Sequence, residues 1–279
     1  RVLRQQPADC IPVSPFIHVN YVKEFFGDHD VDPVTATPAV YAHFGFDLIH
    51  RNCSPAYDAW GPAGAGWELD VQTQPEGRDE TTVTTIHTAG GDLRTVEKLR
   101  WVYEFDAESS PQEYLIKSEA DFELVKRYQP ALPPSDASAV ARAREAVGEA
   151  GIVAPWIQGA FNLLAIYYRK LDDLLMDAML RPAFYAEMME YFLARYMGHV
   201  QALIDAGADV LAYAGNVANG KLVSRRFFET YIAPYERRLI DWTRSSSRAR
   251  APPPSTTTAA IPGRCCRSTR LWGWARMSP

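Results

Sequence analysis

The stretch that most constrains the fold is residues 199–242, which reads as helix, tight turn, strand, loop and helix. Apolar residues recur with helical spacing up to Ile204, and Gly207 stands where a helix end takes a left-handed residue. The apolar run 209–213 is long enough for one buried strand and too short for another helix. A Gly- and Asn-rich loop follows, and Ser224 is the expected N-cap of the next helix. Parallel α/β folds place ligand contacts at strand-to-helix junctions of this kind.

The rest of the chain predicts further strands and helices around this unit. Their alternation from residue 152 to residue 242 favours parallel βαβ units. We therefore expect an α/β fold of the (β/α)₈ TIM-barrel type, incomplete at the C-terminus. The expected strands are 10–17, one that ends before Asn52, 81–88 in a hairpin with Gly90-Gly91, and 152–159; the expected helices lie within 21–44, at 119–128, at 137–151, at 171–180 and from Pro182 onward, with loops at 60–79 and 130–135.

Several segments resemble one known superfamily. The strand AGADVLAYAGN is followed by KLVSRRFFETYIAPY, and PADCIPVSPF, TTIHTAGGDLRTV and EYLIKSEADFELVKRY come earlier in the chain. Together they resemble the uroporphyrinogen decarboxylase superfamily, in outline over residues 1–242. The resemblance implies a TIM barrel with its active site at the carboxyl ends of the strands. We expect a barrel domain at 1–242 and a separate tail at 243–279.

The superfamily includes the decarboxylases of haem synthesis and the zinc-dependent cobamide methyltransferases, which move methyl groups between corrinoid proteins and thiols or other acceptors. The decarboxylases have an Arg-rich loop after the first strand, because Arg forms bidentate contacts with the carboxylates of the porphyrin. The corresponding stretch here, IHVNYVKEFFGDHD, contains no Arg. We therefore expect methyl transfer, with a small-molecule substrate and a corrinoid protein as partner.

Two alternatives stay open. The first is uroporphyrinogen decarboxylase itself, which needs no metal cofactor. The second is an inactive fragment or a non-catalytic binding protein. A barrel without its last strands exposes sheet edges, so a fragment of this kind is expected to pair with another chain, for example as a homodimer.

Candidate site residues stand at or just beyond the carboxyl ends of the predicted strands. His18 and Asp58 are the candidates for catalysis: His18 because it stands at the end of the first strand, and Asp58 for proton transfer or metal support, although either could be structural. A Trp is more often core than ligand platform, and a loop Asn more often shapes a turn. Relatives commonly have an acidic residue near Asn216, so acid–base chemistry is not expected of this amide. The candidates for substrate binding are Asn20, Asn52, Tyr57, Trp156, Gln158, Tyr213 and Asn216.

Zinc is expected from the family, but its His-x-Cys motif is absent in frame, and His18, Cys53 and His87 are single residues without motif spacing. No metal ligand is therefore assigned.

From Thr243 onward the chain has seven Arg and no Asp, Glu or Lys. One interpretation of this tail is a disordered basic arm. The preferred one is a frameshift near residue 243, because codons for STTTAA can give Tyr-His-Asn-Cys-Gly in another frame.

Composition excludes several classes of protein. The first 242 residues have 22 Lys and Arg against 34 Asp and Glu, a net charge of −12, which argues against a nucleic-acid partner. No run of about 18 apolar residues predicts a membrane span. The four cysteines form neither a disulfide framework nor a C-x-x-C pair, and no signal peptide is recognisable. A cytoplasmic location is expected.

Overall fold

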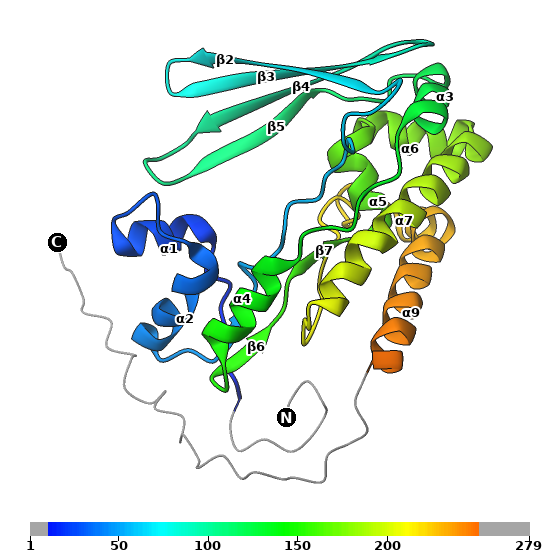
Figure 1. The fold of residues 1–279 in the computed structure, drawn as a ribbon. Coiled ribbons are helices and arrows are strands. Elements are labelled where there is room, and N and C mark those ends of the chain that lie inside the picture. The colour runs from blue at the N-terminus through cyan, green and yellow to red at the C-terminus, as the bar shows by residue number, and fades with distance from the viewer. Residues whose placement is uncertain (1–10, 251–279) are drawn as a thin grey trace, which may run out of the picture.

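The computed structural model describes residues 11–250 of the 279-residue chain. Figure 1 shows their arrangement: a helical body on one side, a four-stranded sheet that leans over it, and two N-terminal helices on the other side. In chain order the elements are α1 (Val19–Phe26), α2 (Pro33–Phe44), β1 (Leu48–His50), β2 (Glu68–Glu76), β3 (Asp79–Thr88), β4 (Gly91–Trp101), β5 (Ala107–Glu113), α3 (Glu119–Tyr128), α4 (Ser138–Val147), β6 (Gly151–Val153), β7 (Trp156–Gln158), α5 (Ala160–Leu163), the π-helical turn η2 (Leu164–Tyr168), α6 (Leu171–Leu180), α7 (Pro182–Asp205), β8 (Ala212–Ala214), α8 (Arg225–Phe227), the π-helical turn η3 (Phe228–Ile232) and α9 (Ala233–Arg250).

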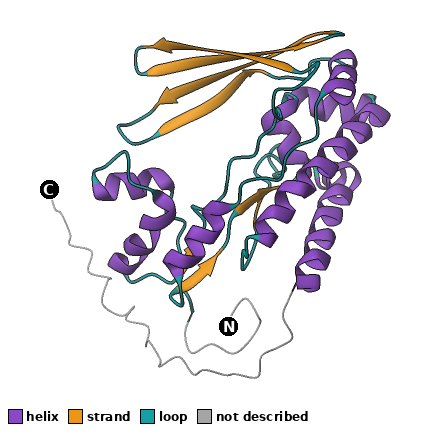
Figure 2. Ribbon diagram, viewed as in Figure 1, coloured by secondary structure: helices purple, strands orange, loops and turns teal. Residues whose placement is uncertain are grey.

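The parallel strands form two pairs, β1 with β6 and β7 with β8 (Figure 2). Only Ala154 and Pro155 separate β6 from β7, and hydrogen bonds continue across them. The amide of Ala154 donates to the carbonyl of His50 at 2.8 Å, and the amide of Ala212 donates to the carbonyl of Pro155 at 2.9 Å. Three parallel segments therefore lie side by side, and the middle one is interrupted where proline has no N–H to donate.

This arrangement confirms the predicted mixed α/β class but not a closed barrel. Within residues 11–250 the parallel strands are β1, β6, β7 and β8, and the outer sides of β1 and β8 have no strand neighbour. The single strand predicted at 152–159 is present as β6 and β7. The strand predicted at 209–213 is shorter and begins at Ala212.

Helix α7 is the centre of the hydrophobic core. Pro182 occupies its first turn, as predicted, and Gly207 follows its last turn with φ +90°. Helices α3, α6 and α9 pack against it (Figure 1). Its buried positions recur at helical spacing: Phe184, Tyr185, Met188, Met189, Phe192, Leu193, Tyr196, His199, Val200, Leu203 and Ile204.

The antiparallel sheet has the strand order β2-β3-β4-β5. The predicted hairpin is confirmed, with Gly91 at φ +136° in its turn. The loop predicted at 60–79 is wrong for its second half, which forms β2. That strand lies at the edge of the sheet and is almost entirely exposed. Leu69 and Val71 do alternate with polar residues, but the Gly, Pro and polar residues around them favoured a loop. At the other edge, the turn between β4 and β5 reaches the N-terminal helices, where His29 stacks on Phe105 at 4.1 Å.

The strand predicted at 10–17 is wrong. Residues 11–18 have no regular structure, because Pro12 and Pro15 cannot donate to a ladder. The segment is nevertheless held beside β1: the amide of Val13 donates to the carboxylate of Asp47 at 2.7 Å, and its carbonyl accepts from the Asp47 amide at 2.9 Å.

Three helix predictions are tested by the local geometry. Ser118 caps α3 with a capping box to Asp121, and Ser224 caps α8, both as predicted. The helix predicted at 137–151 ends earlier, at Val147, because Gly148 takes φ +49°. None of the helices within residues 11–250 combines the length and hydropathy that a membrane span requires.

Helix α9 continues across residue 243, where the sequence suggested a boundary, and ends at Arg250. The segment 255–260, whose alternative frame would encode His-x-Cys, lies outside the described residues. The frameshift therefore stays a prediction.

A buried ion pair joins the sheet connection to the helical body. The guanidinium of Arg169 donates to Asp177 in α6 at 2.9 Å and to the carbonyl of Ile116 at 3.0 Å, and both charged side chains are buried. Arg181, half-exposed, is a second partner of Asp177. Because both charges are out of water, each depends on the other to offset its lost hydration.

We predict that Asp177→Asn lowers the free energy of unfolding by about 3–5 kcal/mol, because it removes the buried carboxylate and leaves the Arg169 charge only the half-exposed Asp173, at 4.0 Å. The matched control is Glu190→Gln, which removes the carboxylate of an Arg238 pair with both side chains about half exposed. That variant should lower the free energy of unfolding by less than about 1 kcal/mol. Urea denaturation of the three proteins checks this, and equal losses in the two variants would contradict it.

Candidate functional site

The carboxyl ends of β1, β7 and β8 meet at one edge of the parallel segments. Side chains alternate along a strand, so Trp156 and Gln158 share one face of β7. Their register partners on β8 are Ala212 and Ala214. Two large side chains therefore lie beside two small ones on the same face. We call it the inner face.

Arg51, just beyond β1, also lies on the inner face. Its guanidinium carbon is 5.9 Å from the centre of the Trp156 ring and 5.4 Å from that of Phe16. The two rings meet edge to face at 5.5 Å. The hydroxyl of Ser54 accepts the backbone N–H of Trp156 at 2.6 Å, which ties the end of β1 to β7.

Hydrogen bonds fix the orientation of Gln158. Its side-chain carbonyl accepts from the amide of Asn162, whose own carbonyl oxygen accepts from the backbone of Val217 at 3.1 Å. Its backbone N–H donates to the hydroxyl of Tyr196 at 2.7 Å. The network leaves the Gln158 NH₂ group as a donor with no partner within the described part of the chain.

Glu236, in α9, is a buried carboxylate on the other side of β7. It accepts from the backbone N–H groups of Ala160 at 3.0 Å and Phe161 at 3.2 Å, and from the hydroxyl of Tyr213. Burial raises the pKa of the Glu236 carboxyl, and the three donors counteract part of that increase. Gly159 is required here, since a Cβ would lie 2.8 Å from the Glu236 oxygens.

The first predicted catalytic residue, His18, lies beside the inner face. Its ring meets Phe16 edge to face at 5.8 Å, and its Nδ1 accepts from the backbone N–H of Asn20 at 3.3 Å. This contact favours the tautomer that has its proton on Nε2, so the free side of the ring is a donor. Asn20 itself is turned away and donates to Asp106 in the turn between β4 and β5.

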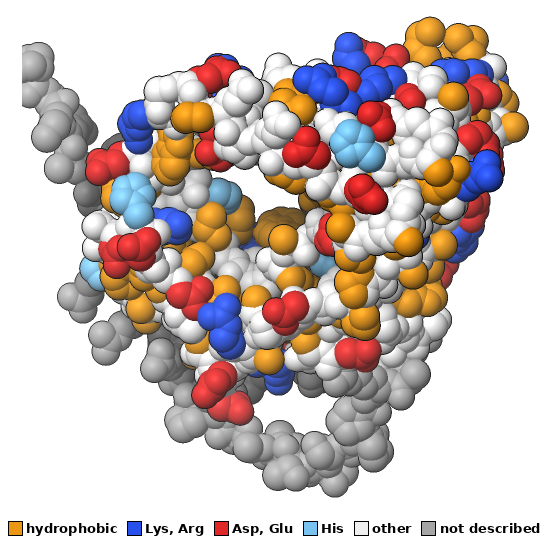
Figure 3. Space-filling model, turned by 45° about the horizontal axis from the view of Figure 1, so that its top comes forward, with side chains coloured by type: hydrophobic (Ala, Val, Ile, Leu, Met, Phe, Trp, Pro, Cys, Tyr) orange, Lys and Arg blue, Asp and Glu red, His pale blue; other side chains and the backbone are white. Residues whose placement is uncertain are grey.

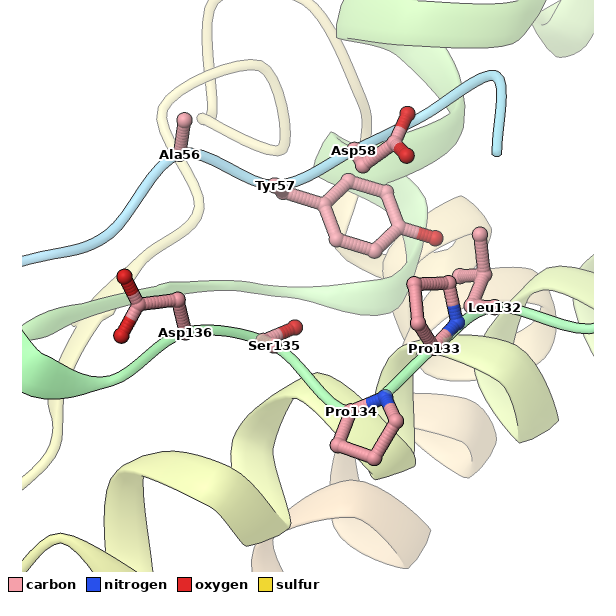
Figure 4. Close-up of a pocket in the computed structure, with 8 residues that line it drawn as sticks. All are labelled: Ala56, Tyr57, Asp58, Leu132, Pro133, Pro134, Ser135 and Asp136. Atoms are coloured by element: carbon pink, nitrogen blue, oxygen red, sulfur yellow. The ribbon is translucent and has the colours of Figure 1, made fainter. Parts of the chain in front are cut away.

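The second, Asp58, lies elsewhere, in an exposed turn where it accepts from the backbone N–H of Gly61 at 2.9 Å. Asp58 and Tyr57 line a cavity of about 270 Å³ between the chain after β1 and the linker 132–136 (Figure 4). Behind it, Ser135 bonds to Nδ1 of His199 at 2.9 Å, and burial lowers the pKa of His199 to about 4. An imidazole that resists protonation in this way is a poor general base at neutral pH.

The other predicted substrate-binding residues have different surroundings in the fold. Trp156 and Gln158 come together on the inner face, and Asn216 is exposed in the loop after β8. Asn52 is structural in its contacts, since its amide donates to the carbonyl of Ile17 at 2.8 Å and to the hydroxyl of Thr37 at 3.0 Å. Tyr213 shares the opposite face with Ile157 and reaches Glu236.

Sequence reasoning missed Arg51, Asn162 and Glu236. Strand alternation could have identified Arg51, which directly follows an apolar strand. Helical spacing could have identified Glu236, which shares a face with Ile232 and Leu239. Nothing in the sequence around Asn162 marks it as the link between two strand ends.

Comparisons with known proteins concern the family and the fold of the chain. The uroporphyrinogen decarboxylase (URO-D) family model matches residues 102–252, just over half of the chain. The chain belongs to the URO-D family. Among solved structures it is similar to a methyltransferase from Methanosarcina mazei, with a TM-score of 0.52, 13% identity, 88% of this chain covered and 64% of that one. At this identity the similarity concerns the fold. No curated protein sequence matches this chain.

The chain thus spans about two thirds of the length of that methyltransferase. A zinc site is expected from the family resemblance. Within residues 11–250, however, no three His, Cys, Asp or Glu side chains converge as metal ligands. The described residues therefore do not fit zinc.

We predict that Glu236→Gln lowers the free energy of unfolding by about 1–3 kcal/mol at neutral pH. An amide has one acceptor oxygen for three donors, so at least one buried N–H or O–H loses its partner. The control is Glu229→Gln on an exposed turn of the same helical segment, which should change stability little. Denaturant unfolding measures the stability of both variants. A stability of Glu236→Gln equal to that of the wild type would contradict the role of Glu236 as a buried acceptor.

The wild type and Glu236→Gln also test the direction in which the pKa of Glu236 is shifted. Because the folded-state pKa is raised, the stability from this carboxyl is fully present below its unfolded value and is lost as the pH rises through the folded value. The stability of the wild type relative to Glu236→Gln should therefore increase as the pH falls from 7 toward 4.5.

His199 should make the protein acid-sensitive. Its folded-state pKa of about 4 lies below the ordinary 6.5, so the unfolded chain takes up the proton first and stability is lost as the pH falls between these values. From pH 7 to pH 4 the wild type should lose about 3 kcal/mol more than His199→Gln. Parallel pH profiles of the two proteins would show that burial does not control this histidine.

Proposed function

We propose that this URO-D family chain is a methyl-transfer enzyme whose substrate binds on the inner face. A corrinoid protein is the proposed partner, as methyl donor in its methylated form or as methyl acceptor in its unmethylated form. The observation that carries the proposal is the grouping of Trp156, Gln158 and Arg51 beside the small Ala212 and Ala214 at the strand ends. The fold similarity to a methyltransferase supports the choice of reaction.

In this proposal each inner-face residue has a limited task. The Trp156 ring forms an apolar wall, and the NH₂ group of Gln158 donates to a substrate oxygen. His18 donates from Nε2 at the rim, and Asn216 contacts the substrate from the loop after β8. A methyl-corrinoid would supply an electrophilic methyl group and keep the electron pair of the broken cobalt–carbon bond. The acceptor thiol would give its proton to solvent, and the residues of this chain would orient the acceptor and exclude bulk water from the methyl group.

Decarboxylation of a porphyrinogen is the second candidate, and Arg51 is the observation that favours it. Arg is the side chain best suited to bidentate carboxylate contacts. Uroporphyrinogen, however, has four acetate and four propionate groups, and within the described residues Arg51 is the one guanidinium placed on the inner face. This argues for a substrate with fewer charges.

We further propose that β1, β6–β7 and β8 are neighbouring strands of a (β/α)₈ barrel. The open sides of β1 and β8 would be covered by further strands or, as the fragment alternative requires, by a second copy. A nucleic-acid partner is not proposed, because acidic and basic side chains are interspersed on the face in Figure 3. The cytoplasmic location stays a prediction.

The test follows methyl transfer from methylcobalamin, or from a methylated corrinoid protein, to a panel of thiols, with and without added Zn²⁺. We expect absorbance changes that report loss of the cobalt-bound methyl group. Gln158→Leu should reduce the rate at least tenfold, whereas Gln112→Leu on the exposed surface of β5 should not. Loss of carboxylates from uroporphyrinogen, with no methyl transfer, would overturn the proposal in favour of the decarboxylase.

A further inference from the structure

Arg51 is a cation without an ionic partner in an acidic protein. The full chain has a net charge of −5, yet within the described residues no carboxylate lies within ion-pair distance of this guanidinium. It is half-buried beside Phe16 and Trp156. A guanidinium that has lost part of its hydration gains most from an anionic partner.

The hydrogen bonds of Arg51 are also incomplete. One terminal nitrogen, Nη2, donates to the carbonyl of Ser14 at 3.1 Å. Its Nε and the hydroxyl of Ser14 are buried, and neither has a hydrogen-bond partner among residues 11–250. The Ser14 contact holds the side chain in place, while the two terminal NH₂ groups keep donors for a ligand. Two terminal nitrogens match the two oxygens of a carboxylate.

The neighbouring polar groups are donors too. The hydroxyl of Ser54 already accepts from Trp156, so its hydrogen is free to donate. The oriented Gln158 amide presents its NH₂ group. A surface that offers N–H and O–H donors around one fixed positive charge is complementary to a singly charged oxygen anion.

We propose that Arg51 recognises a carboxylate on the substrate, and that Phe16 and Trp156 contact the apolar or aromatic body attached to it. One guanidinium balances one negative charge, which favours a monocarboxylate over a phosphate dianion or a porphyrin. The inference deepens the proposed function, since it names the substrate class at the same inner face, but it does not depend on methyl transfer.

The experiment uses benzoate as the probe and benzamide as its neutral counterpart, measured by tryptophan fluorescence and titration calorimetry on the full chain. Benzoate should bind saturably, and benzamide and inorganic phosphate at least tenfold more weakly. Arg51→Gln should weaken benzoate binding at least tenfold, with Arg51→Lys intermediate because it keeps the charge but not the bidentate fork.

The matched control is Arg78→Gln, since Arg78 also lies over a tryptophan, 5.4 Å from the Trp101 ring, but in the antiparallel sheet. It should bind benzoate like the wild type. Equal benzoate affinity in the wild type and Arg51→Gln, equal affinity for benzoate and benzamide, or no saturable binding would each overturn the proposal. If Arg51→Gln does not fold, the proposal is tested by the benzoate affinity of Arg51→Lys and by the difference in affinity between benzoate and benzamide.

The outcome is separable from that of the methyl-transfer assay. Benzoate binding that depends on Arg51, in a chain that transfers no methyl group, would remove the proposed reaction and leave the carboxylate site. Methyl transfer to thiols that is unchanged in Arg51→Gln, together with unchanged benzoate affinity, would remove the site and leave the reaction.

Discussion

The buried carboxylate of Glu236 connects the three parts of the chain on which the site depends. It comes from α9, accepts the first N–H groups of α5 after β7, and receives the hydroxyl of Tyr213 from β8. A negative charge at that depth is costly unless several donors surround it. The contact therefore fixes where β7 and β8 end, and with them the positions of Trp156 and Gln158.

The two faces of the same short strands have different roles. The face toward α9 is closed by Tyr213, Glu236 and the obligatory Gly159, so it determines stability. The inner face keeps Arg51 and Gln158 with unused donors beside small alanines. A π-helical turn follows each of β7 and β8, at η2 and η3, and such turns are common near functional sites. Structural and binding functions are thus separated by strand alternation.

Much of the architecture could be predicted from the sequence, because the signals are local. Pro182, Gly207, Ser118 and Ser224 mark helix ends by backbone geometry and capping, and the structure agrees at each. The failures are also local in origin. The apolar run near Val13 suggested a strand, but its prolines cannot form a ladder. In β2 the alternation of Leu69 and Val71 with polar residues was overlooked among the Gly, Pro and polar residues of 60–79.

The sequence by itself determined the family, through the resemblance of several segments to a known superfamily. It also determined the α/β class and the strand-end positions of Trp156 and Gln158, since periodicity and turn residues act within a few residues of chain. Only the tertiary structure decided which side chains meet. Arg51 and Trp156 are distant in sequence and adjacent in space, and Asp58, although close to Arg51 in sequence, lies in a separate turn. Pairing of parallel strands through long connections sets these distances, and no local pattern encodes that pairing.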